Sequence, residues 1–309
     1  MRVEQTPIED RRRTVRDPRH PGPTWSAARD GLARAYRETR SESLARIAGL
    51  SDADATVQSM EDASPAKWHL AHTTWFFETF VLLPASPDHQ AFDERFGFLF
   101  NSYYEALGER QPRPRRGLLT RPTLQTVLDY RESVDSKVLG LLESEPPSWL
   151  QERVELGIQH EQQHQELQLT DILHLFAQNP LRPAFRSLEP GRPPLVPSLP
   201  AALDREWIGL PGGIVGIGAG AGAEGFAFDC EQPRHDALIR PFRMASTPVR
   251  NREWREFMQE GGYATASLWL ADGWEWVKRE GWSAPLHWQA QDGDWLQMTL
   301  HGLLPIDPE

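Results

Sequence analysis

The sequence predicts a two-domain protein of the α + (α+β) class, in which a four-helix bundle precedes an irregular mixed domain. Apolar residues recur at helical spacing in several segments between residues 25 and 178. From Trp207 onward, glycine clusters, short apolar runs and eight of the twelve tryptophans replace that spacing. Seven prolines fall within residues 179–206, a density typical of an interdomain linker. The 309 residues therefore divide into a polar tail (1–24), a bundle (25–178), a linker (179–206) and a second domain (207–309).

The sequence predicts the bounds of all four helices. Apolar residues recur every three or four positions over residues 25–50, which predicts the first helix. Ser64 followed by Pro65 is typical of an N-cap and a first helical position, and Pro84 is expected to end this second helix. The third and fourth helices are expected over residues 122–143 and 149–177.

A long connection, residues 84–121, separates the second helix from the third and is rich in Pro, Gly and Arg. Loops of this length in a compact domain are usually functional, so we expect this connection to bind a ligand. Four helices with one long crossover predict an up-and-down bundle whose functional side chains face inward. In the second domain only residues 251–260 have a clear helical pattern, so an irregular, loop-rich domain is expected there.

The composition excludes several classes of protein. Lys and Arg number 33 against 44 Asp and Glu, and the net charge of −11 argues against a nucleic-acid surface. No apolar run approaches the roughly 18 residues of a membrane span, and the first residues lack the apolar region of a signal peptide. The single cysteine, Cys230, excludes a disulfide framework and fits a reducing cytoplasm. A cytoplasmic protein with small-molecule partners is expected.

The strongest local motif is the string HEQQH, which begins at His160 and ends at His164 in the fourth expected helix. Residues four apart lie on one helix face, so the two imidazoles are close enough to hold one metal ion. Gln168 and Asp171 continue that face, and buried polar groups of this kind need partners. The alternative is a solvated polar helix face, because the stretch is rich in Gln and Glu.

The same string matches the HExxH pattern of zinc metalloproteases, in which Glu161 would be the general base. That alternative needs a third downstream ligand. One protease class requires Gly and His at positions where this chain has Leu167 and Thr170, and a proline-rich linker follows the helix. The protease is therefore the weaker alternative.

A third nitrogen ligand is expected from the second helix. His69 and His72 both lie there among aromatic residues, and spacing alone does not choose between them. Glu78 would instead complete a site of two histidines and one carboxylate. Three neutral imidazoles with open positions for substrate and O2 suit Fe(II). Glu161 or Glu166 is expected to orient a ligating imidazole from behind.

Several separated motifs, in the same order, resemble the sulfoxide synthases of ergothioneine biosynthesis, the EgtB family. In the bundle these are WHLAHTTWFFETF, NSYYEALGERQPRPRRGLL and HEQQHQELQLTDILH followed by NPLRPAF. In the second domain they are WIGLPGGIVGIGA, FAFDCEQPRH and LWLADGWEWVKREGW. The resemblance covers the chain from about residue 25 to its end. It implies a DinB-like bundle followed by a C-type-lectin-like domain similar to formylglycine-generating enzyme.

The resemblance also implies a site. The family's three iron-binding histidines correspond to His72, His160 and His164, and this correspondence, not the spacing, selects His72 over His69. Arg113 and Arg116 match a basic segment that binds the carboxylates of the thiol substrate. The implied partners are hercynine, cysteine or γ-glutamylcysteine, and O2, with Fe(II) as cofactor. A solvated basic loop is the alternative for the two arginines.

The family's second domain continues past the position of Glu309 and there carries the Tyr credited with proton donation, so no catalytic residue can be placed in this chain. The resemblance therefore implies an incomplete second domain, which a second polypeptide would complete. Two further alternatives stay open: a catalytically inactive metal-binding remnant, and a relative that uses a selenium donor.

Overall fold

The computed structural model describes residues 29–102, 104, 108–144, 146–188, 205–220 and 225–308. The expected polar tail lies outside the described residues, as does most of the expected linker. The four long helices of the bundle are α1 (Arg29–Ile47), α3 (Ala66–Phe77), α6 (Leu124–Glu143) and α7 (Ser148–Gln178).

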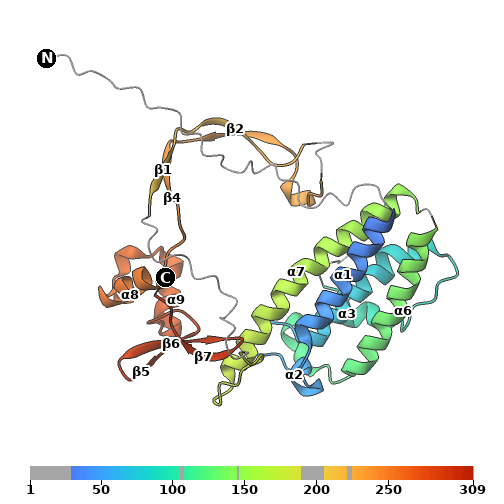
Figure 1. The fold of residues 1–309 in the computed structure, drawn as a ribbon, viewed down its shortest axis with the longest axis horizontal. Coiled ribbons are helices and arrows are strands. Elements are labelled where there is room, and N and C mark those ends of the chain that lie inside the picture. Colours follow the sequence, from blue (N-terminus) through green and yellow to red (C-terminus); the bar gives the residue numbers. More distant parts are fainter. Residues whose placement is uncertain are drawn as a thin grey trace.

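These four helices form the predicted bundle. Helix α1 lies beside α7, and α3 packs against both α6 and α7 (Figure 1). The facing sides are apolar and form one core that contains Tyr36, Phe77 and Ile158, each fully or almost fully buried. Burial of this apolar area is the main force that holds the helices together. The described core cluster lies wholly in the bundle.

The first residues of α3 and α6 differ from the prediction by one or two positions, and the helical segment that α3 begins ends at Ala85, one residue after the Pro84 that was expected to end it. Pro65 is the N-cap of α3, and Ser64 lies one position before it, where its hydroxyl accepts a hydrogen bond from Arg116. Thr123 caps α6 through its hydroxyl, which accepts from the backbone N–H of Thr126. After α3 the chain continues through a π-helical turn, η1 (Glu78–Leu82), into the short α4 (Leu83–Ala85).

The long connection packs on the bundle and contains two short helical segments, α5 (Phe96–Phe100) and the 3-10 helix η3 (Arg113–Leu118). Both terminal phenylalanines of α5 are buried. The buried carboxylate of Glu78 accepts hydrogen bonds from the backbone of Phe92 at 2.9 Å and from the hydroxyl of Tyr130 at 2.6 Å. A short helix that the sequence analysis did not predict, α2 (Asp52–Thr56), lies before α3.

The second domain begins with a long, kinked two-stranded ribbon (Figure 1). At the kink Gly212 has a φ of 73°, and a Cβ there would lie 2.4 Å from the carbonyl oxygen of Ile239, so only glycine fits. The ribbon pairs β1 (Trp207–Leu210) with β4 (Phe242–Ala245), and β2 (Gly213–Ile217) with β3 (His235–Ile239), all antiparallel.

The rest of the domain contains two helices and an antiparallel meander. Helix α8 (Asn251–Gln259) confirms the predicted helix of residues 251–260, whereas α9 (Ala271–Glu280) was not predicted. Helix α9 ends at Gly281, which adopts the left-handed conformation common at helix C-termini. The meander consists of β5 (Trp288–Gln291), β6 (Asp294–Thr299) and β7 (Gly302–Pro305).

The meander contacts the C-terminal end of the bundle through the backbone. The carbonyl oxygen of Leu300 accepts from the N–H groups of Phe185 and Arg186, both at 2.9 Å. The Nδ1 atom of His301 lies 2.9 Å from the carbonyl oxygen of Arg186. None of the described helices combines the length and hydropathy that a membrane span requires.

Candidate metal centre

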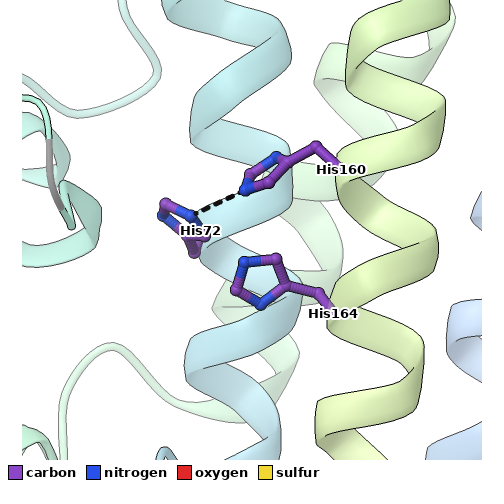
Figure 2. A group of neighbouring side chains, drawn as sticks. All are labelled: His72, His160 and His164. Carbon is purple, nitrogen blue, oxygen red and sulfur yellow. Dashed lines mark hydrogen bonds between the residues drawn. The ribbon is translucent and has the colours of Figure 1, made fainter. Parts of the chain in front are cut away.

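Three histidines from two helices converge inside the bundle. His72 comes from α3, and His160 and His164 come from α7, where their spacing of four residues places both rings on the face toward α3 (Figure 2). One ring nitrogen from each residue lies within 4.8 Å of the other two. The Nε2 atoms of His72 and His160 are 3.2 Å apart. We call these residues the histidine cluster.

Burial keeps the rings of the cluster neutral. It lowers the pKa of His160 to about 4, and it lowers the pKa of His72 and His164 well below the ordinary value. The neighbouring rings and the charge of Arg116 lower the pKa values of His72 and His164 further. A neutral imidazole offers one nitrogen lone pair, so three such rings that face one another suit a divalent metal of the first transition row.

Hydrogen bonds behind two of the rings fix which nitrogen faces inward. The Nδ1 of His72 lies 2.6 Å from the carbonyl oxygen of Phe100. A carbonyl can only accept, so this Nδ1 carries the proton and the Nε2 lone pair faces the cluster. The Nδ1 of His164 lies 2.8 Å from the Nδ1 of His69. Within the described structure the Nδ1 of His160 is buried and has no hydrogen-bond partner.

The structure also places the two other candidate ligands of the second helix. His69 is 1% exposed and lies behind His164, and its Nε2 is 3.0 Å from a carboxylate oxygen of Asp171. Glu78 faces Tyr130 and the backbone of the long connection. The group that the fold brings together therefore contains His72 and neither of these alternatives.

The expectation that Glu161 or Glu166 orients a ligating imidazole is wrong. The carboxylate of Glu161 is 1% exposed and faces α1 and α6, where it binds Arg40 at 2.8 Å, the hydroxyl of Ser43 at 2.5 Å, and Arg131. Glu166 is exposed on the surface of α7. His69 and the carbonyl oxygen of Phe100 occupy the positions behind the rings instead.

This placement also removes the role that the zinc-protease alternative assigns to Glu161. Burial alone would raise the pKa of this carboxyl, but the charges of Arg131 and Arg40 outweigh burial and lower its pKa to about 2. A carboxylate held by two guanidinium groups, on a side of α7 that faces α1 and α6, is not available to activate a water at the cluster.

This ion network, which connects three helices, was not predicted from the sequence. Arg40 on α1 also binds Asp135 on α6 at 2.6 Å, and Arg131 on α6 donates to the carbonyl oxygen of Arg40. One signal was present: Arg131 interrupts the apolar stripe of its helix between Val127 and Val134. A charged residue on a buried stripe requires a buried counter-ion.

The two predicted substrate-binding arginines lie in different surroundings. Arg116 is 4% exposed, and its guanidinium lies 3.4 Å from the ring centre of Trp68 and donates to the hydroxyls of Ser64 and Ser102. Trp68 in turn stacks on His72, with ring centres 4.6 Å apart. Arg113 is half-buried, and its carbonyl oxygen accepts from Gln58.

A cavity of about 1160 Å³ adjoins the cluster at His160, and small-molecule sites have volumes of this order. One wall is the N-terminal half of α7 with Phe76 and Tyr104, and the other is the segment between β2 and β3. Glu152, Glu155, Gln163, Phe226 and Phe228 are among its lining residues.

Comparisons with known proteins match both domains. Residues 35–179 match the DinB superfamily, and residues 194–306 match the sulfatase-modifying factor enzyme 1-like domain. A protein named hercynine oxygenase from Mycolicibacterium smegmatis is 30% identical over 262 residues, which cover 84% of this chain and 58% of the relative. Proteins of the same name from Mycolicibacterium thermoresistibile and Mycobacterium tuberculosis are 29% and 28% identical, over 83% and 84% of this chain and 54% and 56% of their own lengths. Over most of its length the chain is therefore similar to the EgtB family.

The two domain matches confirm the predicted fold class, a DinB-like helical domain followed by a sheet-containing domain of the sulfatase-modifying-factor type. The histidine cluster lies within the first matched domain. The chain spans a little more than half the length of the curated relatives that it matches.

Proposed function

We propose that this chain takes part in an Fe(II)- and O2-dependent reaction that joins a thiol to hercynine in ergothioneine biosynthesis. The histidine cluster carries the proposal, because three neutral imidazoles converge inside a chain whose curated relatives are named hercynine oxygenase. The thiol is cysteine or γ-glutamylcysteine. In the overall reaction a C–S bond replaces the C–H bond of the imidazole and the S–H bond of the thiol. One atom of O2 becomes the sulfoxide oxygen, and the other leaves as water with the two hydrogens.

His72, His160 and His164 would hold Fe(II), which supplies the redox chemistry that O2 requires. Three protein nitrogens leave coordination positions for substrates. The carbonyl oxygen of Phe100 holds the ring of His72 in the tautomer that a ligand needs. Packing of α3 and α7 buries His72 and partly buries His160 and His164, which limits access of bulk water.

Arg113 and Arg116 would bind the carboxylates of the thiol substrate. A guanidinium pairs with a carboxylate through two parallel hydrogen bonds, and the charge of Arg116 is close enough to the cluster to lower the pKa of His72 and His164. The same positive charge favours an anionic group, such as a thiolate, beside the rings. The cavity at His160 offers space for the second substrate.

A product assay tests the proposal. The purified chain, loaded with Fe(II) in air, is given hercynine with cysteine, γ-glutamylcysteine or a selenium analogue, and products are identified by mass spectrometry. A sulfoxide adduct that gains one labelled oxygen from ¹⁸O2 supports the proposal and names the thiol, and the variant His164→Ala should then give none. A selenium adduct alone would favour the selenium-using alternative. Bound iron without any adduct would favour a non-catalytic metal-binding role.

A further inference from the structure

A second row of hydrogen-bonded groups lies behind the histidine cluster. The Nδ1 of His164 contacts the Nδ1 of His69 at 2.8 Å, and the Nε2 of His69 contacts Asp171 at 3.0 Å. The same oxygen of Asp171 accepts from the backbone N–H of Ser64 at 2.9 Å. The row therefore runs from α7 through α3 and back to α7, and its carboxylate is held at the start of α3.

The chemistry of the two ends fixes the direction of every hydrogen bond in the row. An ionised carboxylate only accepts, so the Nε2 of a neutral His69 carries the proton and donates to Asp171. The Nδ1 of His69 then has a lone pair and accepts from the Nδ1 of His164. The remaining nitrogen of His164, Nε2, keeps its lone pair and faces the other two rings, as Figure 2 shows.

The row is buried and belongs to the helix framework. His69 is 1% exposed, and the side chain of Asp171 is 13% exposed. Asp171 lies seven residues after His164, which is close to two turns of α7, so both side chains are on the face toward α3. Rotation of the His164 ring would leave buried nitrogens without hydrogen bonds, which costs free energy.

We infer that His69 and Asp171 position His164 for metal binding, a role that rests on the proposed function because it presupposes the histidine cluster as the metal site. Partners of this kind behind a ligating imidazole fix its tautomer and orientation, and their loss lowers metal affinity by about 10- to 100-fold. His69 is thus a positioning residue and not a fourth ligand. Its Nδ1 faces the outer nitrogen of His164, on the side away from the cluster.

Metal affinity of the full chain tests this role. Fe(II) and Co(II) are titrated against a chelator of known affinity, and the Co(II) absorption spectrum reports the ligand set. His69→Phe should keep one metal per chain but bind it about 10- to 100-fold more weakly. His69→Gln should recover most of the loss, because its amide oxygen accepts and its NH2 group donates. His174→Phe is the matched control: it removes another buried histidine of the bundle, one that pairs with Ser59, and should leave affinity unchanged.

The outcomes separate the inference from the function on which it rests. Equal affinity of His69→Phe and the unaltered chain would overturn the positioning role alone, as would a Gln variant no better than the Phe variant. A Co(II) spectrum that loses one nitrogen ligand in both His69 variants would make His69 a ligand and overturn the role as well. If the unaltered chain bound no metal, the proposed function itself would fail. Thermal unfolding of the metal-free variants shows whether any loss of affinity is a loss of fold.

Discussion

The three rings of the histidine cluster depend on one another, because each alone is a weak ligand. We predict that His72→Ala, His160→Ala and His164→Ala each abolish stoichiometric iron binding, since two imidazoles leave the ion in reach of water and competing ligands. Iron content after desalting, at one equivalent of Fe(II), measures the effect, and His174→Ala serves as the control. If all three variants kept full occupancy, the cluster would not be the metal site.

Glu161 lies between the two cluster histidines in the sequence of α7, but its side chain stabilises the fold and does not face the cluster. Glu161→Gln is expected to destabilise the folded chain by about 3–5 kcal/mol, because Arg40 and Arg131 would lose their buried counter-ion. The free energy of unfolding in urea gives the measurement. Glu166→Gln makes the same change at an exposed position of the same helix and should stay within about 0.5 kcal/mol. Equal effects of the two substitutions would contradict the structural role.

The histidine cluster could be predicted from the sequence better than the residues around it. The spacing of His160 and His164 is a local property of one helix, so it could be read directly from the sequence. The orientation of Glu161 could not, because its partner Arg40 lies on another helix, 121 residues away. The contact of His69 with His164 likewise depends on how α3 and α7 pack.

Close approach of α3 to α7 depends on Gly157, one turn before His160. A Cβ at this position would lie 2.3 Å from a ring carbon of Phe77, which is fully buried and has no room to move. Gly157→Ala should therefore destabilise the bundle by about 1–3 kcal/mol, although alanine is the better helix former. Gly140→Ala on α6 is the matched control, because nothing lies within 4 Å of its Cβ. That control should stabilise by about 0.5–1 kcal/mol, and denaturant midpoints compare the two.

Two buried tyrosines connect elements of the bundle, and their ionisation is expected to lower its stability at high pH. Tyr36 donates to Asp135, and Tyr130 donates to Glu78, both at 2.6 Å. Burial raises the pKa of both phenols well above the ordinary value, and the neighbouring carboxylates raise it further. Above about pH 10 the unfolded chain therefore binds fewer protons than the folded chain, so the free energy of unfolding falls as pH rises.

Urea unfolding at pH values from 8 to 11 checks this prediction. The unaltered chain should lose stability above about pH 10, and the double variant Tyr36→Phe, Tyr130→Phe should lose it less steeply. Equal slopes for the two chains would assign the alkaline loss to other groups.

Apolar spacing and the Ser64-Pro65 signal predicted the long helices of the bundle within a few residues, although α3 buries all twelve of its residues and not one stripe alone. The π-helical turn at Glu78–Leu82 and the packed long connection were not predicted, since both depend on contacts with Tyr130 and the backbone around Phe92. Helix α9 was missed because three of its ten residues are tryptophan or valine, which are weak helix formers.

At the scale of the whole chain, the order of the two domains was predicted, but the distribution of buried surface was not. Residue periodicity indicates which face of an element is apolar, not what covers it. The described core cluster lies in the bundle, whereas Ile214 and Leu238 on the two-stranded ribbon are 73% and 79% exposed. Of the described apolar residues of the second domain, Val277, Met298 and Ile306 are buried. Most of the buried apolar surface and the histidine cluster thus lie in the bundle.

This concentration predicts that the bundle is an independent metal-binding unit. Residues 1–188 contain the histidine cluster, the ion network around Glu161 and the His69–Asp171 pair, and the described backbone contacts to the meander are confined to residues near Leu300. A fragment of residues 1–188 should therefore fold cooperatively and bind Fe(II) with the affinity of the full chain. It should form no adduct with hercynine, because one wall of the cavity at His160 comes from second-domain residues such as Phe226 and Phe228. Circular dichroism, iron titration and the product assay measure the three properties. A fragment that folds but binds iron at least tenfold more weakly would show that the second domain helps to build the metal site.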